Sequence, residues 1–124
     1  MAHEGFHEDP TKLSEFTKDY HRIIQSTMEE LEAIDWYNQR AEAANDPSAK
    51  AIMEHNRDEE IEHACMGLEW LRRNSPVWNE MMQKFMFTEG DIIVQESGNT
   101  DQTVQGSPAI VAAPTGTLKI GNNS

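Results

Sequence analysis

The sequence predicts an all-α protein: an antiparallel two-helix hairpin, one short C-terminal helix and a disordered C-terminal tail. Three helix-start signals carry this prediction, because Asp9, Asp46 and Ser75 each stand directly before a proline. A short polar side chain caps the first backbone N–H groups of a helix, and proline suits the first helical turn. The implied helices run over residues 10–44, 47–73 and 76–88.

The first two of these helices are joined by a tight connection. Only Asn45 and Asp46 separate them, and so short a link between two helices makes them antiparallel neighbours. At 1.5 Å per residue the first helix is roughly 50 Å long. The sequence therefore predicts a long hairpin that folds at Asp46.

The composition changes after Glu89. Residues 91–114 are rich in Gly, Ser, Thr, Gln and Pro and have no helical period, which predicts a disordered linker. Beyond them Leu118 and Ile120 alternate with polar residues. The predicted divisions are a flexible N-terminus (1–9), a helical domain (10–90), the disordered linker (91–114) and a C-terminal peptide (115–124).

Charge and composition limit the classes of partner. The 22 acidic and 10 basic residues give a net charge of −12, which disfavours nucleic acid and anionic membrane surfaces. The single cysteine, Cys65, excludes an internal disulfide framework and fits a reducing compartment. No apolar run approaches the roughly 18–20 residues of a membrane span. We expect a cytoplasmic protein that binds neither nucleic acid nor membrane.

Each long helix has an apolar face that contains charged or ionisable residues. Residues spaced by three and four positions share a helix face, and by this spacing Glu60 and His63 lie in the middle of the apolar face of the second helix. That face is made by Ala49, Ile52, Met53, Asn56, Glu60, His63, Ala64, Gly67, Trp70 and Leu71. The matching face of the first helix, which includes Glu30, is made by Phe16, Ile23, Ile34, Tyr37, Ala41 and Ala44.

Folding the hairpin at Asp46 brings three of these residues to one height. Glu30 precedes Asp46 by 16 residues, whereas Glu60 and His63 follow it by 14 and 17. Antiparallel helices of equal rise place the three side chains at the same level on facing sides. This coincidence predicts one cluster built from both helices.

The carboxylates of this cluster need a counter-charge, because an unpaired carboxylate in an apolar seam costs several kcal/mol. Residues 29–35 and 58–62 contain eight acids and no Lys or Arg, which leaves Arg57 as the local salt-bridge partner. Carboxylate oxygen with imidazole nitrogen suits iron, manganese and zinc. The alternative is a chance Glu-x-x-His on an acidic helix, in which His63 is a hydrogen-bonded core histidine.

Glu30, Glu60 and His63 make up half of the ligand set of the four-helix di-iron carboxylate proteins. Those proteins take one Glu from each of two helices and a Glu-x-x-His from each of the other two. This chain has one such Glu, Glu30, and one Glu-x-x-His, from Glu60 to His63. Two hairpins packed face to face supply the whole set about a two-fold axis. We therefore expect a homodimer that forms a four-helix bundle.

Further residues near the cluster have two interpretations each. Tyr37 is either a hydrogen-bond donor or outer ligand beside the metal, or an interface aromatic. Glu29, Glu32 and Asp35 form either a solvated charged face or an approach that attracts cations to the site. Cys65 points away from the apolar face and is not expected to be a ligand.

Three stretches of the chain closely resemble the encapsulated ferritins, a branch of the ferritin-like superfamily. The stretches are MEELEAIDWYNQR, HNRDEEIEHACMGLEWLRRN and FMFTEG, and the resemblance covers residues 10–90. It implies a half-ferritin protomer, a dimer with a ferritin-like four-helix bundle, and a decameric ring of such dimers. It also implies ferroxidase activity, the oxidation of Fe(II) to Fe(III) by dioxygen.

The resemblance also implies roles for individual residues, with a di-iron site at the dimer interface as the implied cofactor site. The implied catalytic residues are Glu30, Glu60, His63 and Tyr37, of which Glu30, Glu60 and His63 bind iron, and the implied metal-attracting acids are Glu29 and Glu32.

The C-terminal peptide resembles the cargo-loading peptides that dock inside encapsulin shells. The similar residues are Gly116, Thr117, Leu118, Lys119, Ile120 and Gly121. In extended form Leu118 and Ile120 would insert into shallow apolar pockets, while the linker gives reach. This resemblance implies an encapsulin shell protein as partner and a location inside an encapsulin nanocompartment, where iron is stored.

A ferroxidase that delivers iron to such a shell is the function that the sequence favours. Two Fe(II) ions would bind across the dimer interface, bridged by the Glu60 carboxylates of the two chains. Two other functions stay open: a non-catalytic helical adaptor, and a manganese- or zinc-dependent ferritin-like protein, since the ligand set does not fix the metal.

Overall fold

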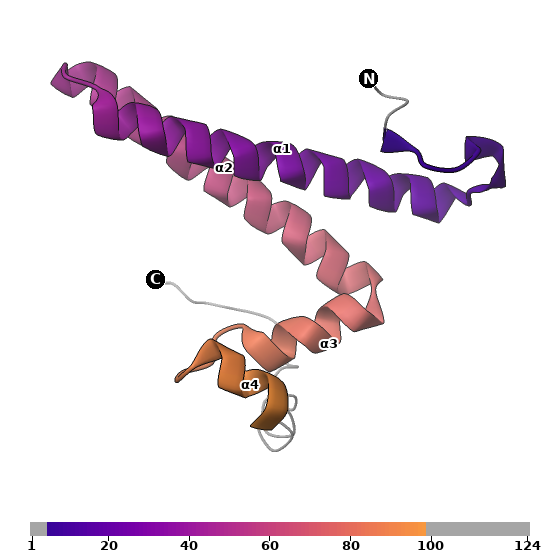
Figure 1. The fold of residues 1–124 in the computed structure, drawn as a ribbon. Coiled ribbons are helices and arrows are strands. Elements are labelled where there is room, and N and C mark those ends of the chain that lie inside the picture. Colours follow the sequence, from indigo (N-terminus) through magenta and orange to yellow (C-terminus); the bar gives the residue numbers. More distant parts are fainter. Residues whose placement is uncertain (1–4, 99–124) are drawn as a thin grey trace. The chain divides into compact units, whose positions relative to one another are not determined.

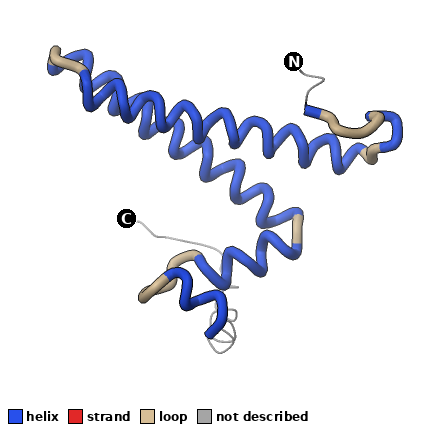
Figure 2. Tube along the Cα trace, in the orientation of Figure 1, coloured by secondary structure: helices blue, strands red, loops and turns tan. Residues whose placement is uncertain are grey.

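The computed structural model describes residues 5–98, and all the regular elements of these residues are helical (Figures 1 and 2). The chain divides between Asn74 and Ser75 into two compact units. The first unit holds a 3₁₀ helix (η2) and the long helices α1 and α2, and the second holds the short helices α3 and α4. The all-α prediction is confirmed.

Helix α1 spans Glu15–Ala43, so the predicted start at residue 10 is wrong. Asp9 caps the 3₁₀ helix Pro10–Lys12 instead, with its carboxylate accepting the N–H of Thr11 at 3.0 Å. The extended backbone of Leu13 ends that turn. Two start signals therefore follow one another, and the second one begins the long helix.

The second signal is Ser14, which was not among the predicted start residues. Its hydroxyl accepts the backbone N–H of Thr17 at 3.0 Å, as the N-cap residue of an α-helix does. At the other end, Ala44 is extended and donates its N–H to the carbonyl of Arg40 at 2.9 Å. The predicted end at residue 44 is therefore correct to within one residue.

Helix α2 spans Pro47–Asn74, and the predicted helix 47–73 is confirmed. The Asp46 carboxylate accepts the N–H of Ala49 at 2.8 Å, which caps the helix as predicted. Across the turn, Lys50 donates from Nζ to the carbonyl of Ala41 at 3.0 Å. Helices α1 and α2 pack along one another as the predicted hairpin (Figure 2).

The seam between α1 and α2 has a small core of mostly small residues. In the described part of the chain only Ala41, Ala64 and Leu71 are buried hydrophobic residues. Buried Thr27 lies against Gly67, where an added Cβ would overlap the Thr27 hydroxyl and lie 3.4 Å from its Cβ. A helix-interior glycine costs up to about 1 kcal/mol relative to alanine. Here it lets the two backbones approach closely.

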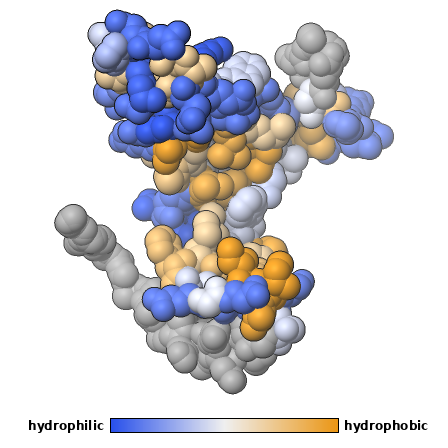
Figure 3. Space-filling view, turned by 60° about the vertical axis from the view of Figure 1, so that its left-hand side comes forward, coloured by the Kyte–Doolittle hydropathy of each residue, from blue (hydrophilic) through white to orange (hydrophobic). Residues whose placement is uncertain are grey.

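Much of the hairpin's apolar surface remains exposed. Figure 3 shows hydrophobic side chains gathered in patches at the surface beside hydrophilic ones. The large hydrophobic residues of α1 and α2 that are exposed are Phe16, Met28, Leu31, Trp36, Ile52, Ile61 and Met66. So much exposed apolar surface is typical of a chain that associates with another copy or with a partner.

The second unit contains helix α3, Pro76–Phe85, which is capped by Ser75 as predicted. It ends three residues before the predicted end at 88, because Met86 is extended and Phe87 adopts a left-handed backbone with φ of 59°. Such a backbone cannot continue a right-handed helix.

Helix α4, Ile92–Gly98, occupies the start of the segment that was expected to be a disordered linker from residue 91. The Asp91 carboxylate accepts the N–H of Ile93 at 2.9 Å and supplies a start signal that was not among the predicted ones. Buried Gln95 donates to the carbonyl of Glu89 at 3.0 Å, which ties α4 to the preceding loop. The expected linker is therefore wrong for 92–98.

The C-terminal peptide at 115–124 lies outside the described residues. Within the described residues, none of the helices combines the length and the apolar character needed to cross a bilayer.

Candidate metal centre

Glu30, Glu60 and His63, the three predicted ligands, lie together in the hairpin. One ligand atom from each lies within 4.8 Å of the others. His63 Nδ1 lies 3.6 Å from Glu30 Oε1 and 3.5 Å from Glu60 Oε1. Glu30 comes from α1, and Glu60 and His63 come from adjacent turns of α2. The hairpin therefore brings the three side chains to one level, as the spacing about Asp46 predicts.

All three side chains are partly exposed. The exposed fraction is 28% for Glu30, 24% for Glu60 and 42% for His63. A structural core histidine is usually buried and hydrogen-bonded within its own chain. A cluster that is sheltered by two helices and still reachable from outside suits residues that share a ligand with another molecule.

Electrostatics at the cluster favour a bound cation. The neighbouring Glu60 carboxyl raises the pKa of Glu30, first by a hydrogen bond between the two acids and also by like-charge repulsion. Burial raises the pKa of Glu30 further, while His63 opposes the shift. A like charge at such close range disfavours the ionised form of Glu30, and a bound cation would relieve this repulsion.

Arg57, the cation that the sequence offered as a salt-bridge partner, points to other groups. Its NH1 donates to Asn38 Oδ1 across the seam at 3.0 Å, and its Nε donates to Asp58 Oδ1 at 3.0 Å. Neither contact involves Glu30 or Glu60. In the described structure, therefore, Arg57 forms no salt bridge with these two acids.

The donor set fits a transition-metal ion. Two carboxylates and one imidazole are oxygen and nitrogen ligands of the kind that iron, manganese and zinc accept. Three side chains from one hairpin leave coordination positions to be filled by a second molecule or by water. The geometry therefore supports a metal site that one chain holds only in part.

The other predicted site residues lie outside this three-residue cluster. Glu29 and Glu32 are exposed on α1, and Gln25 donates to Glu29 at 3.4 Å. Tyr37 is half-buried, with the guanidinium of Arg40 5.3 Å from the centre of its ring. The roles of Tyr37, Glu29 and Glu32 remain predictions.

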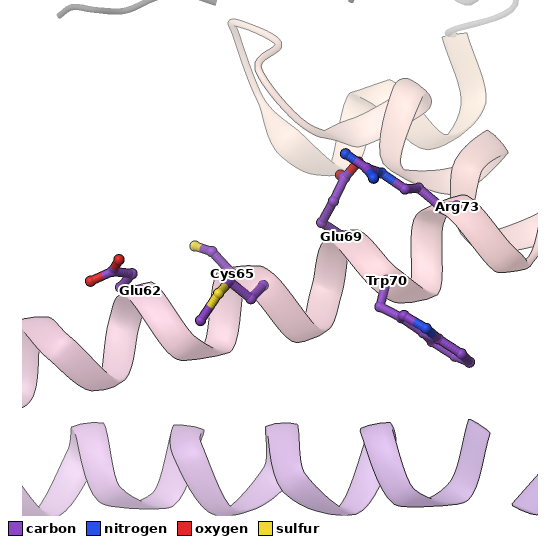
Figure 4. A pocket seen from close by; sticks show the side chains of 6 residues that line it. Glu62, Cys65, Glu69, Trp70 and Arg73 are labelled. Carbon is purple, nitrogen blue, oxygen red and sulfur yellow. The ribbon is translucent and has the colours of Figure 1, made fainter. Parts of the chain in front are cut away.

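Cys65 lies on a different face of α2 from the cluster. Figure 4 shows Cys65 and Glu62 pointing away from α1, whereas Trp70 points to the other side of α2. A groove along α2 is lined by Glu62, Cys65, Met66, Glu69, Trp70 and Arg73. The expectation that Cys65 points away from the ligands is confirmed.

Glu69, in the same groove, is a carboxylate with its own cations. Arg72 donates to it through Nε at 2.9 Å and NH2 at 2.8 Å, and Arg73 donates through Nε at 2.7 Å. These bonds, chiefly those from Arg72, lower the pKa of Glu69 to about 2. The cluster at Glu30 and Glu60 is thus a different kind of site from an ordinary acidic helix surface.

Comparison with known proteins gives a consistent result along most of the chain. The family model described as EncFtn-like matches residues 5–89. An encapsulated ferritin-like protein of Rhodospirillum rubrum is 49% identical over 119 residues, covering 94% of this chain and 85% of the relative. A ferritin-like protein of Thermotoga maritima is 44% identical over 103 residues, covering 81% of this chain and 90% of the relative.

A solved structure shows the same fold. The crystal structure of a protein from Nitrosomonas europaea matches with a TM-score of 0.69 and 50% sequence identity. The match covers 71% of this chain and 97% of the other. The helical arrangement described above is therefore shared with an experimentally determined relative.

Proposed function

Because the chain belongs to the EncFtn-like family, we propose that it is a ferroxidase. The substrates are Fe(II) and dioxygen, and the site is a di-iron centre shared between two chains. The oxidised iron is delivered for storage inside an encapsulin shell. The observation that carries the proposal is the cluster of Glu30, Glu60 and His63, whose ligand atoms lie within 4.8 Å of one another.

Two copies of the chain supply the complete ligand set. Each hairpin contributes one Glu30 and one Glu60-x-x-His63 motif, which is half of the set that four-helix di-iron carboxylate proteins use. The exposed apolar side chains on both helices offer surface for the pairing. A two-fold axis through the site makes the two irons equivalent. Further pairing of such dimers into a decameric ring belongs to the same proposal.

Each residue has a distinct role in the proposed reaction. Glu60 of both chains would hold the two substrate irons between them, and Glu30 and His63 would supply the further ligands of each. The carboxylates would lower the cost of the positive charge that is added when dioxygen, as the oxidant, converts Fe(II) to Fe(III). Glu29 and Glu32 raise the local concentration of Fe(II) through their negative field, and Tyr37 orders the ligands beside the metals.

The donor set alone does not choose iron over manganese or zinc, because preference among divalent ions depends on geometry and supply. The names of the relatives favour iron, since one is called an encapsulated ferritin-like protein and another a ferritin-like protein. An adaptor without a metal site would not need two acids and a histidine at one level of the seam.

Oxidation of Fe(II) in air tests the proposed activity. The metal-free protein is mixed with Fe(II) without oxygen, air is admitted, and Fe(III) absorbance is followed against a protein-free control. We expect faster oxidation than in the control, and a return to the control rate in His63→Ala. Background rates in the natural protein would reject the activity. Displacement of Fe(II) from the protein by an equal concentration of manganese or zinc would show that another metal holds the site.

Delivery to a shell is tested separately, through the C-terminal peptide. We propose that Leu118 and Ile120 anchor the chain to the inner wall of the encapsulin. The double variant Leu118→Ala/Ile120→Ala, co-expressed with a shell protein, should be absent from purified shells while it oxidises Fe(II) at the natural rate. Equal packaging of this variant would reject the peptide as the anchor.

A further inference from the structure

We propose that Asn38 tunes the affinity of the metal centre by keeping the Arg57 guanidinium away from it. This inference rests on the proposed metal site and adds a residue that acts on it through charge rather than through coordination. The relevant contact is the hydrogen bond from Arg57 NH1 to Asn38 Oδ1, at 3.0 Å, which crosses the seam between α2 and α1.

Arg57 lies within reach of the centre. It precedes Glu60 by three residues on α2, and side chains three apart on a helix are neighbours. A guanidinium that turned toward Glu60 would add a permanent positive charge to two acids that have the His63 imidazole beside them. This charge would stabilise the metal-free protein and compete directly with a bound cation.

The structure holds Arg57 in another direction. Its side chain is 27% exposed, and its NH1 is fixed by Asn38 while its Nε pairs with Asp58. Asp58 itself is 65% exposed, and exposed pairs of this kind contribute little. The contact with Asn38 is exposed as well, but it crosses to α1 and so ties the guanidinium to the opposite helix, which the Asp58 contact on α2 does not.

The chemistry of Asn38 suits this task. Its amide oxygen accepts the hydrogen bond without adding another negative charge near the centre. Asn38 keeps the Arg57 guanidinium near the acidic surface and directs it away from the proposed metal ligands. Asn38 is thus a positioning residue, which acts on the metal centre through Arg57.

The test compares the affinity for Co(II), measured by visible absorption and by calorimetry, in four assembled, metal-free proteins. These are the natural protein, Asn38→Ala, Arg57→Gln and the double variant. We expect Asn38→Ala to bind Co(II) about tenfold more weakly, as befits one competing charge at a partly exposed site. Arg57→Gln and the double variant should bind at least as tightly as the natural protein.

A merely structural clamp predicts a different pattern. If the hydrogen bond served only to hold the helices together, Arg57→Gln and the double variant would be as weak as Asn38→Ala, and this result would overturn the proposal. Natural affinity in Asn38→Ala would overturn it as well. Gln39→Ala is a matched control, because it removes an exposed hydrogen bond to Asp35 on the same helix and leaves Arg57 in place.

Two further results keep the test decisive. If Asn38→Ala does not assemble, Asn38→Ser replaces it, because the shorter side chain cannot keep the hydrogen bond to Arg57; weaker Co(II) binding in Asn38→Ser then supports the proposal and natural affinity contradicts it. Absence of Co(II) binding in the natural protein would reject the metal site itself and this inference with it. Binding in the natural protein with no difference among the variants would reject this inference alone.

Discussion

Two carboxylates on the same hairpin, Glu69 and Glu30, have opposite electrostatic surroundings. Glu69 receives three hydrogen bonds from Arg72 and Arg73 on its own helix, and its pKa falls to about 2. Glu30 faces Glu60, and its pKa rises. Glu69 thus has arginine partners, whereas the nitrogen beside Glu30 is His63 Nδ1 at 3.6 Å. The two carboxylates differ in whether a guanidinium neutralises them.

The largest difference in metal binding and Fe(II) oxidation should be the one between Glu60→Ala and Glu69→Ala. Glu60→Ala removes the proposed bridge, so we expect loss of metal binding by more than about 100-fold and a correspondingly slow oxidation of Fe(II). Glu69→Ala should leave both unchanged. The measurements are Co(II) affinity and the rate of Fe(III) formation. Natural rates in Glu60→Ala, in an assembled protein, would contradict the proposed role.

A cation placed beside Glu60 should make the cluster resemble the surroundings of Glu69. Asn56 is half-buried and precedes Glu60 by four residues on α2, so Asn56→Lys puts an ammonium group one helical turn away. We expect metal affinity to fall about tenfold, as measured by Co(II) titration. Asn56→Gln is the control of similar polarity, and equal weakening in both variants would show that the effect is not electrostatic.

The smallest expected effects are those on stability as a function of pH. Glu69 has a lowered pKa, so its contribution to stability is complete above the ordinary value of 4.5 and is lost as the pH falls through about 2. Because its side chain is 41% exposed, solvent screening limits this contribution. We expect Glu69→Gln to lower the free energy of unfolding by less than about 1 kcal/mol at pH 7.

Glu30 should behave in the opposite way in the metal-free protein. Its pKa is raised, so any stability it contributes is present below 4.5 and is lost as the pH rises through the raised value. Glu30→Gln should therefore be more stable than the natural protein at pH 7 and lose this advantage in acid. Denaturant unfolding at several pH values measures both variants, and a destabilised Glu30→Gln at pH 7 would contradict the assigned surroundings.

The hairpin and its Glu30, Glu60 and His63 cluster could be predicted from the turn residues and from the number of residues that separate each ligand from the turn. Asp46 and Pro47 mark the turn, and equal distances from that turn put Glu30 beside Glu60 and His63. Helical rise is nearly constant, so the height of a residue along a hairpin can be read from the sequence. This is why three ligand candidates from two helices were predictable.

Other features could not be predicted, because the sequence offers several possible helix-start residues and hydrogen-bond partners and does not show which of them is used. Asp9 and Ser14 both carry a capping side chain, and only the structure shows that Ser14 starts the long helix. Arg57 has several acids nearby, and its actual partner on α1, Asn38, is 19 residues away along the chain. Helix α4 begins at Ile92 without a strong local signal beyond Asp91. Where several capping residues or hydrogen-bond partners are of similar strength, tertiary contacts determine which one is used.

The stoichiometry of iron in the assembled protein tests the central claim most directly. Metal-free protein is loaded with Fe(II) without oxygen, and native mass spectrometry counts chains and irons together. The split site predicts one iron per chain and two per pair of chains, with both lost in His63→Ala. A pair of chains that assembles normally and holds no stoichiometric iron would contradict the account.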